Sequence, residues 1–240
     1  MQTNNYSQTK FHDLLDPSAL SMLRQNGWVL LKNIAPLEQL VEALLTPIGS
    51  LMPQYGQKKF WAVEVKDKDQ GTSLGDQELR LHTELAEFSD PPEYVALYAE
   101  QPANEGGRLR LLDSRPFLAS LTANELSDIL TTEMTVKAED PIAIRYGEFS
   151  YTGPILNISS HGLRLKFDQC FIDQNASDVI KSFRDRLLEY AVDNSIDIKQ
   201  EKGTLLIWDN RFILHGRSAF TDSERRLWRC CVRGREVGKY

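Results

Sequence analysis

Two of the chain's four histidines stand in segments that could bind a metal ion. His82 precedes Glu84 by two residues in the segment LHTELAEF, and His215 follows the apolar run of WDNRFIL. Residues two apart on a β-strand point to the same face, so His82 and Glu84 are expected to project together. Two imidazoles and one carboxylate can occupy one face of an octahedral Fe(II) ion and leave the other positions open. We therefore predict that His82, Glu84 and His215 bind a non-heme iron ion.

Each of these residues also has a purely structural interpretation. An H-x-E pair is often a hydrogen-bonded pair of the core or the surface, and His215 alone could be a core histidine. The other two histidines, His12 in a polar N-terminal arm and His161 in the turn NISSHGLR, are given no ligand role. The same three ligands could hold zinc in a hydrolase, but no H-E-x-x-H motif supplies the general base that this reading needs. The combination of the three residues is what favours an iron site.

A β-rich scaffold is expected to position these residues. From Phe60 onward the chain is dominated by short runs of Val, Ile, Leu and aromatic residues, separated by Gly, Pro, Asp and Asn. Strands are predicted at 28–32, 60–65, 94–100, 108–113, 163–167, 204–209, 211–215 and 226–234. Many short strands with few helices between them indicate a mainly β fold of the sandwich or barrel type, with flanking helices.

Helices are predicted around these strands. Asp16 and Pro17 are expected to begin a helix that ends at Gly27, because Asp caps helix N-termini and Gly ends helices. Further helices are predicted over 37–45, 114–132 and 176–195. The helical segment over 114–132 is expected to break near Thr122. In the last segment an apolar stripe indicates a helix packed on the sheet, and its members are Val179, Phe183, Leu187, Leu188 and Ala191.

Composition bounds the class of protein. The chain has 240 residues, of which 41% are hydrophobic, so residues 1–240 can bury a substantial core and are expected to form one domain. The net charge of −6 and the lack of a dense Lys/Arg patch argue against a nucleic-acid partner. No segment approaches the roughly 20 apolar residues of a membrane span, and no signal segment opens the chain. Because Cys170, Cys230 and Cys231 are expected to be reduced thiols, a cytoplasmic protein without a membrane partner is predicted.

Three segments resemble the taurine dioxygenase and clavaminate synthase-like branch of the Fe(II)/2-oxoglutarate oxygenases. GTLLIWDNRFILHGR, residues 203–217, is similar to the segment around the family's distal iron-binding histidine. Residues 81–113 resemble the proximal segment, and the Glu of their H-x-E pair is similar to the clavaminate synthase and amino-acid hydroxylase branch. LRLKFDQ, residues 163–169, resembles a strand that this branch places near its substrate. With GWVLLKNI near the start, the likeness spans most of the chain.

The resemblance implies a double-stranded β-helix, the jelly-roll core of cupin-like proteins, with Fe(II) and 2-oxoglutarate as cofactors. Two arginines four residues apart match the family's pattern, so Arg225 is expected to bind 2-oxoglutarate and Arg229 to bind the substrate or a second carboxylate. Arg226 falls on the opposite strand face and is expected at the surface. Asp168 is either a residue that receives an ammonium or guanidinium group of the substrate or a solvated turn residue.

The reaction that the resemblance implies is hydroxylation or desaturation of an unactivated C–H bond with O2, with release of succinate and CO2. The H-x-E branch implies an amino acid or a related small polar metabolite as the substrate. Tyr146, Phe149 and Tyr151 are expected either to form a wall of the substrate pocket or to pack as a turn on the barrel. Halogenation is disfavoured, because related halogenases lack the carboxylate ligand that Glu84 supplies.

One position departs from the resemblance. Many relatives carry Thr or Ser just after a Gly-Gly, where it bonds to the co-substrate, but this chain has Leu109, which cannot donate a hydrogen bond. A catalytically silent metal-binding or 2-oxoglutarate-sensing protein on the same scaffold is therefore the alternative interpretation. The loops between Glu100 and Thr135 are shorter than in many relatives, so an open pocket, or one closed by a partner chain in an oligomer, is expected.

Overall fold

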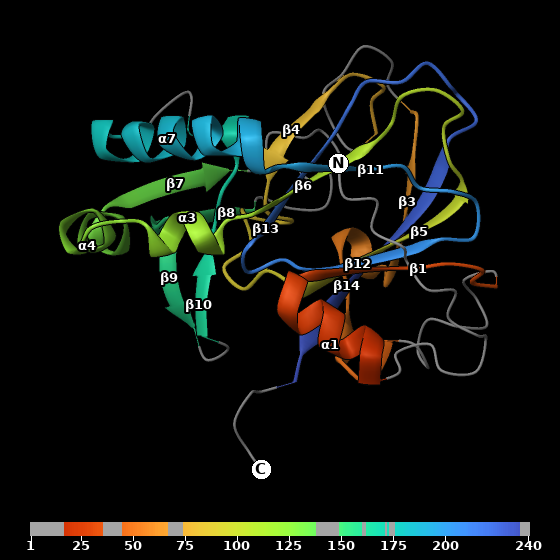
Figure 1. The fold of residues 1–240 in the computed structure, drawn as a ribbon, viewed down its shortest axis with the longest axis horizontal. Helices are drawn as coiled ribbons and strands as arrows, with labels where there is room; N and C mark the ends of the chain where they lie inside the picture. Colours follow the sequence, from red (N-terminus) through yellow and green to blue (C-terminus); the bar gives the residue numbers. More distant parts are fainter. Residues whose placement is uncertain are drawn as a thin grey trace.

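The structure, a computed structural model, describes residues 17–35, 45–66, 74–137, 149–159, 162–170, 172 and 176–235. Within them, two antiparallel sheets carry most of the strands (Figure 1). The larger sheet has the order β1-β12-β5-β14-β2, with β3 also paired to β14. Its strands are β1 (Trp28–Leu31), β2 (Gly49–Met52), β3 (Phe60–Glu64), β5 (Tyr94–Gln101), β12 (Leu205–Asp209) and β14 (Arg226–Gly234). The smaller sheet has the order β11-β6-β13-β4, and its strands are β4 (Leu79–His82), β6 (Leu109–Asp113), β11 (Ile196–Ile198) and β13 (Ile213–Arg217).

The two sheets face each other across a core that apolar side chains from both sheets fill. On β12, Leu206 and Trp208 point into this core, whereas Leu205 and Ile207 pack on helix α1 (Pro17–Asn26) at the outer face. This alternation follows from the two-residue period of a strand. A slip of β12 by one residue would exchange its two buried faces, so its register against β5 is strongly specified.

Two further strand pairs and three described helices pack beside the sheets (Figure 1). The pairs are β7 (Glu133–Lys137) with β8 (Ser150–Pro154), and β9 (Leu156–Ser159) with β10 (Gly162–Leu165). The helices are α3 (Arg115–Ala119), α4 (Ala123–Thr131) and α7 (Asp178–Asn194). None of the described helices is long and apolar enough to cross a membrane.

The predicted break near Thr122 is confirmed. Thr122 Oγ1 accepts a hydrogen bond from the Glu125 N–H at 3.3 Å, and the Glu125 carboxylate accepts one from the Thr122 N–H at 2.7 Å. This reciprocal capping box begins α4. Helix α3 has already ended at Ala119, so the segment 114–132 contains two helices, as expected.

The apolar stripe of α7 differs from the prediction by one residue. Its buried members are Ile180, Phe183, Leu187 and Ala191. Val179 was wrongly included, since it is 39% exposed. Successive helical residues are about 100° apart around the axis, so Ile180 faces the core while Val179 turns to the edge. Leu188 is half-buried against the same core.

Strand β13 also differs from the prediction of 211–215. It begins at Ile213 and continues to Arg217, so His215 lies in its middle. Arg211 forms a turn instead, because its N–H and its Nε donate to Asp209 Oδ1 at 3.0 and 2.9 Å. Strands β2, β7, β8, β9 and β11 were not predicted. Several predictions fall outside the described residues, namely Asp16, the helix over 37–45 except Leu45, His12, His161 and Tyr146.

Candidate metal centre

His82 and His215 lie side by side on neighbouring strands of the smaller sheet. They are direct partners in the pairing of β4 with β13, and their ring centres are 4.1 Å apart. Glu84 completes the group, because its Oε2 lies 3.4 Å from His215 Nε2. One ligand atom from each of the three residues lies within 4.8 Å of the others. The structure thus brings together all three predicted ligands.

Glu84 reaches this group from a turn. Strand β4 ends at His82, and Glu84 opens a turn in which Leu85 has a φ of 56°. The backbone leaves the strand because the Thr83 N–H donates to the carbonyl of Phe167 at 2.7 Å. The expectation that His82 and Glu84 share one strand face is therefore wrong, although their side chains still meet.

Asn210, in the W-D-N corner after β12, holds the backbone of Glu84. Its Oδ1 accepts from the Glu84 N–H at 2.7 Å, and its Nδ2 donates to the Glu84 carbonyl at 3.0 Å and to the Pro92 carbonyl at 3.1 Å. Asn210 is 2% exposed, so water does not compete for these bonds. The segment that resembles the family's distal motif includes Asn210, but no residue pattern in it indicated this role.

The protonation states at the centre suit a metal ion. Burial lowers the pKa of His215 to about 4, with a further contribution from His82. Burial alone would raise the pKa of the Glu84 carboxyl, but Arg229 and His215 outweigh it and hold that pKa well below its usual range. His82 Nδ1 lies 2.9 Å from the carbonyl oxygen of Arg80, which orients the ring and leaves Nε2 as its metal-binding atom. Two imidazoles with an ionised carboxylate are a donor set that fits Fe(II).

Arg229 is already bound to the centre's carboxylate. Its guanidinium forms an ion pair with Glu84, and its Nε donates to Gln54 Oε1 at 2.7 Å. Gln54 in turn donates through Nε2 to the backbone carbonyl of Arg229 at 3.2 Å. All three residues are buried. Sequence reasoning missed Gln54, because no motif surrounds it and its partner is 175 residues away along the chain.

Arg225 has a different environment. Its guanidinium carbon lies 4.8 Å from the centre of the Phe220 ring, and it forms no ion pair with another described residue. Burial lowers the pKa of Arg225 to about 9, and the neighbouring Arg217 adds to the effect. A buried guanidinium without a carboxylate partner is suited to bind an anion. Arg226 is exposed, as expected, and pairs with Glu64 at 3.0 Å.

Asp168 and Leu109 occupy contrasting places. The backbone of Asp168 pairs with that of His82 in an isolated bridge, so this half-buried residue lies next to the centre. Its Oδ1 accepts from the Cys170 N–H at 2.9 Å. Leu109 is buried between the two sheets and faces Arg217 across β6 and β13. The Leu109 side chain therefore packs in the core and offers no hydrogen-bond donor.

Sequence reasoning also missed an acidic residue near the centre. Glu87 is 9% exposed, and its Oε1 accepts from the Tyr55 hydroxyl at 2.5 Å. Burial raises the pKa of the Glu87 carboxyl. The Tyr55 ring packs edge-on against three aromatic rings, those of Trp61, Phe88 and Phe149. Phe149 thus belongs to an aromatic cluster, and the only signal for Glu87 was a carboxylate within the apolar segment LAEF.

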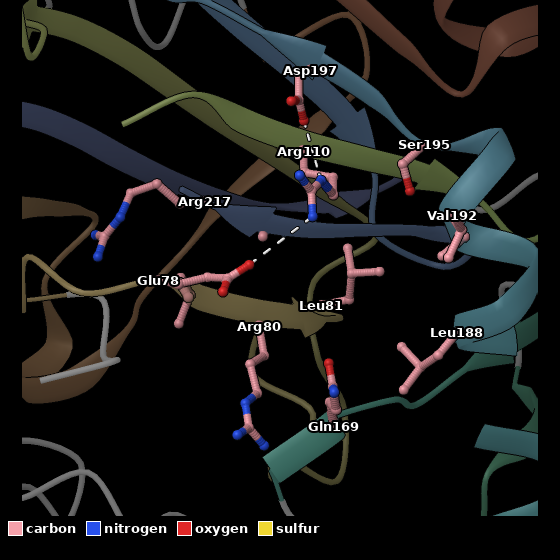
Figure 2. A pocket seen from close by; sticks show the side chains of 13 residues that line it. Glu78, Arg80, Leu81, Arg110, Gln169, Leu188, Val192, Ser195, Asp197 and Arg217 are labelled. Carbon is pink, nitrogen blue, oxygen red and sulfur yellow. Dashed lines mark hydrogen bonds and ion pairs between the residues drawn. The ribbon is translucent and has the colours of Figure 1, made fainter. Parts of the chain in front are cut away.

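A separate cleft of about 760 Å³ lies beside the smaller sheet and α7 (Figure 2). Arg110 stands in it and pairs with Asp197 at 3.2 Å and with Glu78 at 4.0 Å. Arg110 is the cross-strand partner of Gly216, one residue along from His215, so strand alternation places it on the sheet face opposite the metal centre. We assign this cleft no role, because Arg110 is already paired with the two carboxylates that line it.

A family model described as taurine catabolism dioxygenase TauD, TfdA family, matches residues 2–137 and 162–231. The chain belongs to the TauD/TfdA family. Together with the His-Glu-His group, this membership confirms the predicted enzyme class, a non-heme iron dioxygenase that depends on 2-oxoglutarate. No curated protein matches the chain significantly.

Solved structures of similar fold support the architecture expected for the TauD/TfdA family. Asparagine oxygenase in complex with Fe(II), 2S,3S-3-hydroxyasparagine and succinate has a TM-score of 0.71 at 18% identity, over 89% of this chain and 77% of that one. The non-heme iron oxygenase OrfP in complex with Fe and alpha-ketoglutaric acid has a TM-score of 0.66 at 18% identity, over 89% and 77%. A putative alpha-ketoglutarate-dependent taurine dioxygenase from Burkholderia xenovorans has a TM-score of 0.67 at 16% identity, over 96% and 83%. These likenesses confirm the predicted jelly-roll core.

Proposed function

We propose that this TauD/TfdA family member hydroxylates, or desaturates, an unactivated C–H bond of an amino acid or a related small polar molecule. The observation that carries the proposal is the group of His82, Glu84 and His215 in a chain that also buries an arginine, Arg225, without an acidic partner among the described residues. The substrate class is supported by solved structures of similar fold, since one contains hydroxyasparagine and another contains (3S)-hydroxy-L-Arg.

The residues of the centre have distinct tasks in this proposal. His82, Glu84 and His215 would hold Fe(II), which would supply the oxidation of the C–H bond by O2, while 2-oxoglutarate would be converted into succinate and CO2. Arg225 binds the distal carboxylate of 2-oxoglutarate, because its planar fork matches a carboxylate and stays charged. Asn210 keeps the backbone of Glu84 in place, so the carboxylate meets the metal in one orientation.

Two further residues bind the substrate in this proposal. Arg229 receives the carboxylate of the amino acid on N–H groups that its bonds to Glu84 and Gln54 leave unused. Asp168 receives an ammonium or guanidinium group, since its backbone is fixed next to His82. Both contacts orient the C–H bond toward the metal, and the buried setting of Arg229 keeps water from competing there.

The visible spectrum under anaerobic conditions tests the proposal as Fe(II) and then 2-oxoglutarate are added. An α-keto acid that chelates Fe(II) produces a charge-transfer band, which we expect here and expect to disappear in His82→Ala and Glu84→Ala. Glu78→Ala is the matched control, because Glu78 is an exposed carboxylate just before β4. Full iron affinity in Glu84→Ala would show that the ligand assignment is wrong.

Leu109 favours one alternative, a metal-binding or 2-oxoglutarate-sensing protein without turnover. Release of succinate from 2-oxoglutarate in air separates the two functions, because an oxygenase consumes 2-oxoglutarate slowly even without its substrate. A charge-transfer band without succinate release, across a panel of amino acids, would identify a sensor.

We further propose that residues 1–240 act as one domain in the cytoplasm, on O2 and a small molecule, with no nucleic-acid or membrane partner. The three cysteines are free thiols, which agrees with a reducing compartment. A second copy of the chain could close the pocket that the short loops leave open. Sedimentation of the iron-loaded protein with and without 2-oxoglutarate would detect such a dimer.

A further inference from the structure

Two buried arginines, Arg217 and Arg225, lie against the same aromatic ring, that of Phe220. Their guanidinium carbons are 4.7 and 4.8 Å from the ring centre. Each arginine is 3% exposed, and neither forms an ion pair with another described residue. Burial of two like charges is unfavourable unless an anion joins them. The arrangement therefore points to an anion that completes this site.

Arg217 keeps a hydrogen-bond donor unused. One terminal nitrogen, Nη2, donates to the carbonyls of Gly75 and Gln77 at 2.9 and 2.6 Å. Its Nε is buried and has no partner. Burial lowers the pKa of Arg217 to about 10, and the charge of Asp76 acts against this shift. The backbone bonds thus fix the guanidinium while Nε remains for a ligand.

Gly106 and Gly107 pack tightly against the backbone and side chains around Phe220. The backbone of Gly106 pairs with that of Phe220, and a Cβ atom at Gly106 would lie 2.2 Å from the carbonyl oxygen of Ala219. A Cβ atom at Gly107 would lie 3.5 Å from Arg225 Nε. Both glycines have positive φ, 71° and 59°, which favours Gly at both positions. The backbone therefore preorganises Phe220 and Arg225.

The register of β13 places the site around Arg217 and Phe220 next to the metal centre. On β13, His215 and Arg217 are two residues apart, and they face Leu111 and Leu109 of β6 directly. Their side chains hence leave the same face of the sheet, with His215 toward the metal and Arg217 one step further along. In Figure 2 the Arg217 side chain extends away from Arg110, although Arg217 also lines the outer cleft in which Arg110 stands. Leu109 has no side-chain hydrogen-bond donor, but Arg217, its partner across the strands, has one.

We propose that Arg217 is a second arginine of the site for the distal carboxylate of 2-oxoglutarate and that it replaces the donor missing at Leu109. Its charge and its unused Nε attract the carboxylate, and together with Arg225 it holds the Phe220 ring in place. This role rests on the proposed function, because it needs 2-oxoglutarate as the co-substrate.

Anaerobic titration of the Fe(II)-loaded protein separates this role from a structural one. The charge-transfer band is followed with 2-oxoglutarate and with 2-oxopentanoate, which lacks the distal carboxylate. In Arg217→Met the dissociation constant for 2-oxoglutarate is expected to rise about 10- to 100-fold, with little change for 2-oxopentanoate. Arg226→Met is the matched control, because this neighbouring arginine is exposed and paired with Glu64. An equal rise for both oxo acids would leave Arg217 a structural residue only.

A second pair of variants keeps the test independent of folding. Arg217→Lys retains the charge and should bind 2-oxoglutarate more tightly than Arg217→Met. Leu109→Thr should recover part of the lost affinity in the Arg217→Met protein, because it returns a donor to the opposite strand. An unchanged dissociation constant for 2-oxoglutarate in Arg217→Met refutes this role alone. The absence of a band with either oxo acid in the unsubstituted protein refutes the proposed function itself.

Discussion

The Asn210 side chain holds the backbone of Glu84 on both sides, accepting from its N–H at 2.7 Å and donating to its carbonyl at 3.0 Å. Asn210 is itself fixed, because its own N–H donates to the carbonyl of Glu93 at 2.8 Å. The clamp stabilises a turn in which the next residue, Leu85, has a φ of 56°. A corner 126 residues away along the chain thus determines where the carboxylate of the metal centre stands.

Replacement of Asn210 by Ala should loosen the metal centre. The N–H and carbonyl of Glu84 would lose buried partners, at a cost of roughly 1–3 kcal/mol in the free energy of unfolding. The carboxylate would no longer be held in one orientation, so Fe(II) affinity should fall about 10- to 100-fold. Denaturant unfolding of the metal-free protein and anaerobic titration with Fe(II) measure the two effects.

Asn104→Ala is the control for this variant, because Asn104 is exposed and bonds only near the surface, to Asp222 at 2.7 Å. It should leave Fe(II) affinity unchanged. If Asn210→Ala binds Fe(II) as tightly as the unsubstituted protein, the clamp does not orient Glu84.

Replacement by Ala should affect the free energy of unfolding of the metal-free protein differently at Arg225 and at Arg229. Arg229 is the buried counterion of Glu84, so its loss strands a buried carboxylate and should cost about 3–5 kcal/mol in the free energy of unfolding. Arg225 has no acidic partner among the described residues, so its loss removes an uncompensated charge and should be neutral or stabilising. Urea unfolding of both variants checks the contrast, which fails if Arg225→Ala is the less stable protein.

The same two variants should separate co-substrate from substrate. Arg225→Ala should raise the 2-oxoglutarate concentration needed for turnover, because it removes the cation assigned to the distal carboxylate. Arg229→Ala should weaken the substrate more than 2-oxoglutarate. Steady-state kinetics with each compound varied in turn gives both values. The reverse pattern would mean that the two roles are exchanged.

Residue types and local patterns predicted much of this centre. The two histidines and the glutamate stand out in the sequence, and an apolar run located the strand that carries His215. The expected strand at Glu84 was wrong, because a strand and an Asn-clamped turn can both bring Glu84 toward His82. Only the distant bond to Asn210 distinguishes them, and such a contact leaves no local pattern.

Residues that act through long-range contacts could not be found in this way. Gln54 meets Arg229 from 175 positions away, and Tyr55 meets Glu87 from 32 positions away. Gln54 and Tyr55 lie in no periodic or motif-like segment, so no spacing rule predicts their contacts. The error at Val179 is of another kind, because the apolar residues of α7 allow two neighbouring stripes and only packing selects the one with Ile180.

Lys166 should make the stability of the protein depend on pH above neutrality. Burial, helped by the nearby Arg164, lowers the pKa of Lys166 from 10.5 to about 7. Its Nζ donates to the carbonyls of Phe88 and Ser89 at 2.6 and 3.2 Å and lies 3.3 Å from the centre of the Tyr151 ring. Between these two pKa values the unfolded chain holds a proton that the folded chain has released. The free energy of unfolding should therefore rise with pH in this window.

Comparison with Lys166→Met isolates this effect. From pH 7 to about pH 8.5 the unsubstituted metal-free protein should gain roughly 1–2 kcal/mol relative to the variant. Burial raises the pKa of Cys230 to about 12, which lowers stability at higher pH in both proteins alike and cancels in the difference. A constant difference across this range would mean that the two carbonyls and the Tyr151 ring keep the lysine charged.

Substitution of Glu93 alone in its buried pair with Arg164 should strongly lower the free energy of unfolding, whereas substitution of both residues should lower it much less. Both residues are 2% exposed and form an ion pair, and Arg164 also donates to the Pro91 carbonyl at 2.7 Å. Glu93 accepts from the Gly234 N–H at 2.9 Å, which ties the end of β14 to the start of β5. Glu93→Gln keeps an acceptor for Gly234 but removes the buried counterion of Arg164 and leaves it only the exposed Asp90 at 3.6 Å, so it should cost about 3–5 kcal/mol in the free energy of unfolding.

A double-mutant cycle by urea unfolding tests this prediction. Arg164→Met added to Glu93→Gln should recover most of the loss, because it removes the stranded charge and fills the site with an apolar side chain of similar length. The exposed pair of Arg110 and Asp197, each 45% exposed at the side chain, is the comparison, and its coupling should stay below about 1 kcal/mol. Equal coupling in the two cycles would mean that burial does not strengthen the Arg164 pair, and that backbone bonds alone hold β10 and β14 to the segment around Glu93.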